Sequence, residues 1–339
     1  MSLPLPITVI GDGAMATVIA LLLHQQGSRV TLWSPMPDHA DAMIQTRRND
    51  RYLPGHPLPD AMHLTAAPAD VADAQIIVNA IPTQFVRSVW TRLAPHAPQG
   101  APVVSVAKGI ENNTLLRPTQ IIAEVLGDAG VTPGPLASLS GPTIAGELAR
   151  RLPATMCAAC EDANFARRIQ DLFRTDWLRI YTHDDLLGVE LAGAGKNVIA
   201  IAAGVVDGLA AGYNAKSALL ARGLAEITRL GVAMGARAET FFGITGVGDL
   251  ATTCFSPEGR NRSCGELLGK GLSRTEALKK IPGVVEGVDT TISMVALAQR
   301  HKVEMPITAA VHRVLFEDLD PLAAIGQLMT REPKAEQVG

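Results

Sequence analysis

Hydrophobic and polar positions divide the chain into two regimes. Up to about residue 185, short apolar and β-branched runs alternate with helical stretches, the pattern of a doubly wound parallel sheet. The predicted strands are Ile7–Ile10, Arg29–Trp33, Gln75–Ala80, Pro102–Ala107, Leu136–Leu139, Ala154–Cys160 and Leu178–Tyr181. From Val189 onward strand signals vanish, and Ala-, Leu- and Gly-rich helices are predicted around Gly188–Leu209, Ala215–Gly235, Arg274–Lys280, Val288–His301 and Thr308–Leu315.

The two regimes predict two domains. Residues 1–187 are expected to form an α/β dinucleotide-binding domain with a Rossmann-like, mostly parallel sheet, and residues 188–331 an all-α substrate and catalytic domain. The last residues, 332–339, are expected to form a disordered tail. A length of 339 residues agrees with two domains of roughly 150 residues each.

Composition excludes several classes of protein. With 19% charged residues and a formal charge of −3, the chain is neither disordered nor a basic nucleic-acid binder. The first cation is Arg29, so no charged start precedes an apolar secretory stretch. The most apolar run, Val198–Val206, is shorter than the roughly 20 residues that cross a bilayer. We therefore expect a soluble, cytoplasmic protein without nucleic-acid or membrane partners.

Cys157 and Cys160 form a C-x-x-C motif, which is typical of redox sites and zinc sites. They lie in a predicted buried strand, where residues three apart point to opposite faces. No second C-x-x-C accompanies them in the sequence, so a structural role is favoured and no metal is predicted.

The first predicted strand ends in a glycine-rich turn, Gly11-Asp12-Gly13-Ala14-Met15-Ala16, followed by an apolar helix. A G-x-G-x-x-G/A turn between a buried strand and a helix brings a pyrophosphate onto the helix N-terminus. Ala16 takes the third glycine position. The alternative is a glycine-rich turn without a ligand, but the strand–turn–helix context favours dinucleotide binding.

The second strand ends in Ser34 and Pro35, without the carboxylate that usually holds the ribose 2′-hydroxyl of NAD. This omission favours NADP(H) over NAD(H). Arg47 and Arg48 are candidates for a 2′-phosphate contact, although two solvated surface charges are the more ordinary interpretation.

Three further segments follow predicted strands and are expected at the carboxyl edge of the sheet, where ligands bind. They are Ile81-Pro82-Thr83-Gln84, Ala107-Lys108-Gly109 and Ser140-Gly141-Pro142-Thr143. Lys108 is either a site residue with an anionic partner or a strand-end lysine that reaches water.

Lys196 is the sole cation among the small and apolar residues of the predicted helix 188–201. Burial lowers the affinity of an amine for its proton, which suits proton transfer. The alternative is a structural helix–helix salt bridge, for which Glu190 is one candidate partner. Asp249 follows two glycines and is either a site carboxylate or a helix N-cap. Arg260 and Asn261 either bind phosphate oxygens or belong to a surface charge cluster.

Taken in order, these motifs resemble the bacterial glycerol-3-phosphate dehydrogenase [NAD(P)+] family over about residues 7–330. The segments that carry the resemblance are Tyr52–Gly55, Ala107–Ile110, Ser140–Glu147, Gly188–Ile201, Arg222–Glu226, Gly246–Leu250, Arg260–Arg262, Val284–Gly287 and Glu304–Thr308.

The resemblance implies reversible reduction of dihydroxyacetone phosphate to sn-glycerol 3-phosphate, which supplies glycerophospholipid synthesis. It implies a cytoplasmic homodimer and a helical domain similar to the C-terminal domain of 6-phosphogluconate dehydrogenase. The implied catalytic residues are Lys196, Lys108 and Asp249. The implied substrate-binding residues are Lys108, Gly141, Thr143, Lys196, Asp249, Gly259, Arg260 and Asn261. The implied cofactor-binding residues are Gly11, Gly13, Ala14, Met15, Ala16, Pro82, Lys108, Ala145, Arg260, Val285 and Glu286.

Some positions depart from the family pattern. Ala14-Met15-Ala16 replaces Ser-Trp-Gly or Ser-Phe-Gly, and Pro35 replaces a basic residue or histidine. Gly259 replaces a serine. Beside Lys196, Ala192 and Gly195 replace the usual glycine and a larger apolar residue. Two alternatives therefore stay open: a related dehydrogenase acting on another phosphorylated polyol or ketone, and a non-catalytic dinucleotide-binding protein.

Overall fold

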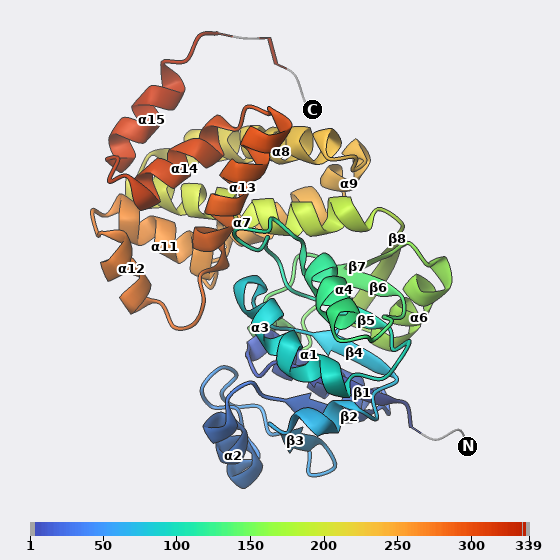
Figure 1. Ribbon diagram of the computed structural model, residues 1–339. Coiled ribbons are helices and arrows are strands. Elements are labelled where there is room, and N and C mark those ends of the chain that lie inside the picture. Colours follow the sequence, from blue (N-terminus) through green and yellow to red (C-terminus); the bar gives the residue numbers. More distant parts are fainter. Residues whose placement is uncertain (1–3, 334, 337–339) are drawn as a thin grey trace. The chain divides into compact units, whose positions relative to one another are not determined.

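The computed structural model describes residues 4–333 and 335–336. By contacts the chain separates into two compact units, one of residues 1–107 and 118–186 and the other of residues 108–117 and 187–339 (Figure 1). The segment 108–117 thus joins the C-terminal unit although it follows a strand of the first, which the sequence pattern did not indicate. The predicted tail lies partly outside the described residues.

The first unit is built on an eight-stranded sheet of order β3-β2-β1-β4-β5-β6-β7-β8. Its strands are β1 (Pro6–Ile10), β2 (Arg29–Trp33), β3 (His63–Thr65), β4 (Ile76–Asn79), β5 (Val103–Ser105), β6 (Leu136–Ser140), β7 (Ala154–Cys160) and β8 (Leu178–His183). Strands β1 to β6 pair in parallel, β7 is antiparallel to β6, and β8 is parallel to β7. The predicted mostly parallel, Rossmann-like sheet is confirmed.

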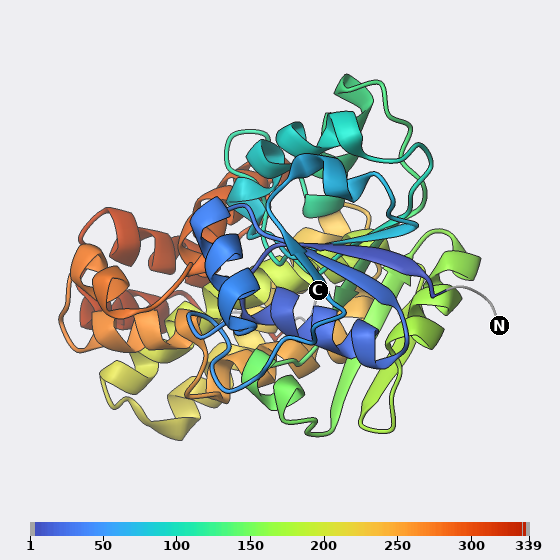
Figure 2. The same ribbon diagram turned by 90° about the horizontal axis from the view of Figure 1, so that it is seen from below.

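Helices lie on both faces of this sheet (Figure 2). They are α1 (Ala14–Gln25), α2 (Pro37–Thr46), α3 (Thr83–Leu93), α4 (Pro118–Asp128), α5 (Ala145–Ala149) and α6 (Ala163–Phe173), with 3-10 turns η1 (Pro68–Val71) and η2 (Ala94–His96). Helix α1 contacts α5 and α6, whereas α3 contacts α4 and η1. The central strands β1 and β4 are mostly apolar because they are buried on both faces, as parallel strands are.

The second unit is all-α within the described residues. Its elements are α7 (Leu186–Gly208), α8 (Gly212–Ala233), α9 (Ala238–Phe242), the π-helical turn η3 (Ile244–Gly248), α10 (Asp249–Phe255), α11 (Arg260–Gly269), α12 (Arg274–Lys280), α13 (Glu286–His301), α14 (Pro306–Phe316) and α15 (Pro321–Met329). All five predicted helices of this unit are present. The sequence pattern missed β3 and the helices α9, α11 and α15, and of α10 it indicated only a helix start near Asp249.

Helix α7 runs through the core of the second unit. Its backbone lies against α11, because a Cβ at Gly204 would stand 1.9 Å from the Arg262 carbonyl oxygen and one at Gly265 would stand 1.9 Å from the Ile201 carbonyl oxygen. Among the described residues, α7 is the one helix long and apolar enough to cross a membrane by length and composition, yet its most apolar stretch is entirely buried inside the fold. Burial of this kind is what the core helix of a globular domain shows.

The four cysteines are free, buried thiols. Burial raises the pKa of Cys157 to about 12 and also raises the pKa of Cys160, whose Sγ lies 3.3 Å from the Leu136 carbonyl oxygen. Both thiols are therefore protonated at neutral pH, and the structural interpretation of the C-x-x-C motif agrees with their place in β7.

Candidate active site

The glycine turn of the first unit has the geometry that a dinucleotide pyrophosphate requires. Gly11 has φ +123°, and a Cβ there would lie 2.9 Å from the Ala80 carbonyl oxygen, so this position excludes a side chain. A Cβ at Gly13 would meet nothing within 4 Å, which leaves the backbone open to approach. Gly13 is the N-cap of α1, and no side chain of the described residues caps that helix. These features fit a pyrophosphate bound by backbone N–H groups and the helix dipole.

The predicted cofactor residues of this unit occupy the start of α1 and other helix starts. Ala14 and Met15 are partly exposed in the first turn of α1, and Ala16 is 1% exposed behind them, where it packs in the core. Pro82 is the N-cap of α3, at the end of β4, and Ala145 is the first residue of α5.

Gly141 and Thr143 follow β6 at the same edge of the sheet. Gly141 has φ +152°, and the Thr143 hydroxyl donates to its carbonyl oxygen at 3.2 Å. All predicted residues of the first unit therefore lie at the carboxyl ends of β1, β4 and β6, as expected for an open α/β sheet.

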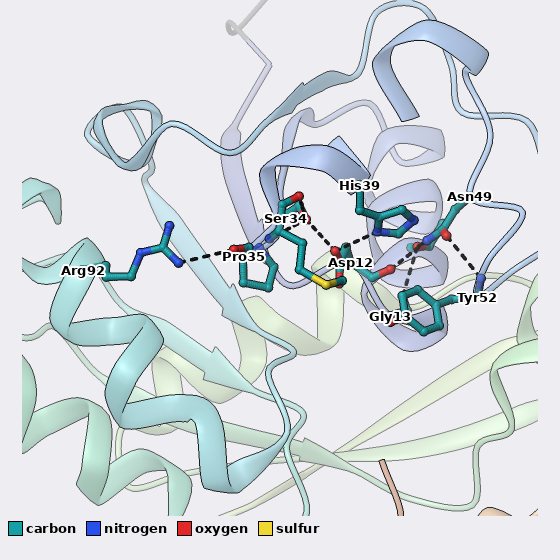
Figure 3. A network of polar contacts seen from close by, with 10 residues as sticks. Asp12, Gly13, Ser34, Pro35, His39, Asn49, Tyr52 and Arg92 are labelled. Carbon is teal, nitrogen blue, oxygen red and sulfur yellow. Dashed lines mark hydrogen bonds and ion pairs between the residues drawn. The ribbon is translucent and has the colours of Figure 1, made fainter. Parts of the chain in front are cut away.

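A buried polar network surrounds the glycine turn, and sequence reasoning missed it (Figure 3). The Asp12 carboxylate accepts from the Ser34 hydroxyl at 2.5 Å, and His39 Nδ1 lies 2.9 Å away. Asn49 is fully buried and donates to the Asp12 carbonyl oxygen and to the Thr17 hydroxyl, each at 2.7 Å. These bonds fix the turn against β2 and α2. The feature of the sequence that could have indicated this network is an ionisable residue, Asp12, between two glycines.

In the second unit, Lys108, Lys196 and Asp249 form one ion cluster. Lys108 Nζ lies 2.6 Å from Asp249 Oδ2, and Lys196 Nζ lies 2.9 Å from Asp249 Oδ1. The side chains are 14%, 9% and 2% exposed, respectively. The structure therefore brings together the three residues that the resemblance implied as catalytic.

The structure bears on two alternatives from the sequence. Lys196 does form a salt bridge between helices, but with Asp249 of α10, whereas Glu190 pairs with Arg117. Asp249 is the first residue of α10 and makes no N-cap bond, because its carboxylate is bound by the two lysines. Thr253, one turn further along α10, accepts a hydrogen bond from Lys196 Nζ at 2.5 Å. Sequence reasoning missed Thr253, although its i, i+4 spacing from Asp249 places both residues on one face of a helix.

Backbone packing explains why glycines precede Asp249. A Cβ at Gly246 would stand 1.8 Å from the Phe241 carbonyl oxygen, so the π-helical turn η3 closes only with glycine at this position. Single π-helical turns are frequent at functional sites. Here the turn delivers the Asp249 carboxylate to the two ammonium groups.

The cluster holds two amines and one bridging carboxylate in a buried setting. Burial lowers the pKa of Lys108, and the Asp249 carboxylate only partly offsets this effect. Burial also acts to raise the pKa of Asp249, but Lys108 and Lys196 together hold it below its ordinary value. Two amino groups thus face the single bridging carboxylate of Asp249, and Glu286 also acts on Lys108. Such a site attracts an anion or an oxygen on which negative charge develops.

Asn197 and Asn261 connect the cluster to its neighbouring helices. Asn197 donates to the Lys108 carbonyl oxygen at 2.9 Å, and Asn261 donates to Asn197 Oδ1 at 2.9 Å. Asn261 Oδ1 in turn accepts from the Gly287 N–H at 2.9 Å. Asn261, predicted as a phosphate ligand, thus has both ends of its amide engaged in positioning α11 against α7 and α13.

The remaining predicted residues lie at the N-termini of α11 and α13. Gly259 is the N-cap of α11, and Arg260 is its exposed first residue. Val285 is the N-cap of α13, and Glu286 follows it close enough to Lys108 to counteract the lowering of the lysine's pKa.

Two family models match this chain. One is the NAD-dependent glycerol-3-phosphate dehydrogenase N-terminus, over residues 6–166, and the other is the C-terminus of the same family, over residues 185–326. Glycerol-3-phosphate dehydrogenase [NAD(P)+] 2 of Salinibacter ruber is 45% identical over 331 residues, which covers 97% of this chain and 96% of the relative. The glycerol-3-phosphate dehydrogenase [NAD(P)+] of Prosthecochloris aestuarii is 44% identical, with 97% and 99% covered.

Solved structures agree with these sequence matches. The crystal structure of glycerol-3-phosphate dehydrogenase from Coxiella burnetii is 37% identical, has a TM-score of 0.92, and covers 97% of this chain and 100% of that one. The yeast enzyme of the same name is 26% identical with a TM-score of 0.80, covering 96% of this chain and 99% of that one.

Proposed function

We propose that this chain, which belongs to the NAD-dependent glycerol-3-phosphate dehydrogenase family, catalyses the reversible NAD(P)H-dependent reduction of dihydroxyacetone phosphate to sn-glycerol 3-phosphate. The observation that carries the proposal is the buried cluster in which Asp249 bridges Lys108 and Lys196. The product would supply the backbone of glycerophospholipids.

The cluster supports a definite division of labour. The coenzyme supplies the hydride that reaches C2 of the ketone, and negative charge then develops on the C2 oxygen. Lys196 would donate the proton that neutralises this oxygen, and Lys108 would stabilise the charge. In the reverse direction Lys196 takes the proton back from the C2 hydroxyl. Asp249 would keep both amines in place and hold a substrate hydroxyl.

Substrate position would be set by groups remote from C2. The exposed Arg260 offers a planar guanidinium for the phosphate, and Asn261 orients the helix that carries it. Gly141 and Thr143 would line the triose. Binding energy from a phosphate remote from the reacting carbon serves to orient a small substrate.

Purified protein tests the proposal in one spectrophotometric assay. NADH or NADPH should be oxidised when dihydroxyacetone phosphate is added, and Lys196→Met should lower kcat by about 10²-fold or more, the contribution expected of a general acid. Lys216→Met is the matched control, because Lys216 is equally buried and also pairs with an aspartate, Asp207. Full turnover in Lys196→Met, with normal thermal stability, would remove the proposed proton donor.

A second candidate is a related dehydrogenase for another phosphorylated polyol or ketone. Gly259 favours it, because the N-cap of α11 lacks a side-chain hydroxyl that the family places there. A panel of phosphorylated ketones of different chain length separates the two candidates through kcat/KM. Coenzyme binding without turnover on any of them would indicate a non-catalytic protein.

We further propose that the protein works as a soluble, cytoplasmic homodimer, with residues 1–187 and 188–331 as its dinucleotide-binding and catalytic domains. Exposed apolar side chains of α15, Leu322 and Met329, support an interface between copies. Light scattering coupled to gel filtration gives the mass directly. A monomer at micromolar concentration contradicts the dimer.

A further inference from the structure

Strand register brings the glycine turn to the end of β2. Ile10 pairs with Trp33, and the Gly11 N–H donates to the Trp33 carbonyl oxygen at 2.8 Å. The next residues, Asp12 and Ser34, are therefore neighbours across the two strand ends, and the Ser34 hydroxyl donates to Asp12 Oδ2 at 2.5 Å. The Asp12 carboxylate therefore lies at the end of β2, although no residue at the end of β2 has a carboxylate of its own.

The carboxylate is held in this place from three sides. His39, on α2, contacts the same oxygen, Oδ2, at 2.9 Å, and Asn49 binds the Asp12 backbone. The Asp12 side chain is 8% exposed, and Oδ1 accepts no hydrogen bond from the described residues. One carboxylate oxygen is thus engaged with the protein, and the other has capacity for a donor from a ligand.

The cations that the sequence offered for a 2′-phosphate are used elsewhere. The Arg47 guanidinium donates to the Met62 and Asp60 carbonyl oxygens, and Arg48 pairs with Asp50. Arg92, near the end of β2, donates to the Pro35 carbonyl oxygen and lies over the Trp33 ring.

We propose that Asp12 is the residue that selects the coenzyme, accepting the 2′-hydroxyl of the adenosine ribose and thereby favouring NAD(H) over NADP(H). In dinucleotide-binding folds this hydroxyl is held by a carboxylate at the end of the second strand. Here the glycine turn supplies the group from the adjacent strand end. A 2′-phosphate carries about −1.5 to −2 charges and would be repelled by the Asp12 carboxylate. The absence of a carboxylate in the sequence of β2, which favoured NADP(H), is thus compensated in three dimensions.

Binding of the coenzyme alone tests this inference, independently of the triose substrate. Dissociation constants for NADH and NADPH are measured by calorimetry on the wild type and on Asp12→Asn, which keeps the shape and removes the charge. The wild type should bind NADH at least about tenfold more tightly than NADPH, because the Asp12 carboxylate would repel the negative charge of the 2′-phosphate. In Asp12→Asn the two constants should come within about threefold of each other, mainly because NADPH binds more tightly.

Asp38→Asn is the matched control, since Asp38 is exposed on the same helix as His39 and its substitution changes the net charge equally. It should leave the ratio of the two constants unchanged. A wild type that binds NADPH as tightly as NADH, or an unchanged ratio in Asp12→Asn, would overturn the inference. The wild-type measurement decides by itself if Asp12→Asn fails to fold.

Discussion

Glu226 provides a sharp test of how buried charge affects this fold. It lies on α8, is 1% exposed, and accepts hydrogen bonds at the start of α14 from the Ile307 N–H at 2.6 Å and the Thr308 N–H at 3.1 Å. Burial raises the pKa of Glu226 to about 7, even though these N–H groups favour the charged form. The perturbation is Glu226→Gln, which is neutral at every pH.

The sign and size of the effect follow from linkage. The ordinary pKa of a glutamate is 4.5, so between that pH and about 7 the folded protein retains a proton that the unfolded chain has lost. The resulting stabilisation is fully present at acidic pH and disappears as the pH rises through about 7. Since one pKa unit equals 1.36 kcal/mol, a difference of about 2.5 gives about 3 kcal/mol.

Urea-induced unfolding of the wild type and Glu226→Gln measures this directly. Between about pH 8 and about pH 5, the wild type should gain about 2–3 kcal/mol of unfolding free energy relative to the variant. Glu276→Gln is the control, because hydrogen bonds from Ser273 lower the pKa of Glu276, so that its stabilisation is lost as the pH falls. Parallel pH profiles for the wild type and Glu226→Gln would refute the reasoning.

Three further substitutions test the packing and the glycine turn. Gly204→Ala should lower the unfolding free energy by about 3 kcal/mol in urea, because the new Cβ would lie 1.9 Å from the Arg262 carbonyl oxygen. Gly127→Ala, on α4 with nothing within 4 Å, should instead raise it by about 0.5–1 kcal/mol, and equal effects would contradict the close approach of α7 and α11. Asn49→Ala removes two bonds that hold the turn, so it should cost about 1–3 kcal/mol and weaken NADH and NADPH binding alike. Unchanged calorimetric affinities for both coenzymes would show that the turn does not depend on Asn49.

Elements with a strong local pattern could be predicted, and the shortest ones could not. Strands β2 and β7 have the predicted bounds and bury most of their residues, and helix α12 has the predicted bounds because it begins at the capping box of Ser273 and Glu276. Strand β3 has only three residues at the edge of the sheet, and α9 has only five. Segments this short carry too few residues to display a period, and tertiary contacts decide their conformation.

In the candidate site, the sequence indicated which residues carry the chemistry but not which of them are in contact. Lys108, Lys196 and Asp249 were identified as chemistry-bearing residues in apolar or glycine-rich surroundings. Their sharing of one carboxylate, at 2.6 and 2.9 Å, could not be read from positions up to 141 residues apart. Asn49 and His39 gave no local signal, because polar residues in a loop and on a half-exposed helix are ordinary.

The sequence by itself determined the architecture: apolar strands, a glycine-rich turn between a strand and a helix, and a helix whose small residues admit close neighbours. These are properties of local pattern and size, and they hold wherever the segments lie. The tertiary structure alone decided which charges meet. In the folded protein Glu190 pairs with Arg117, Asp249 pairs with two lysines, and the Asp12 carboxylate lies at the end of β2. Electrostatic interactions depend on separation in space, which the order of residues along the chain does not specify.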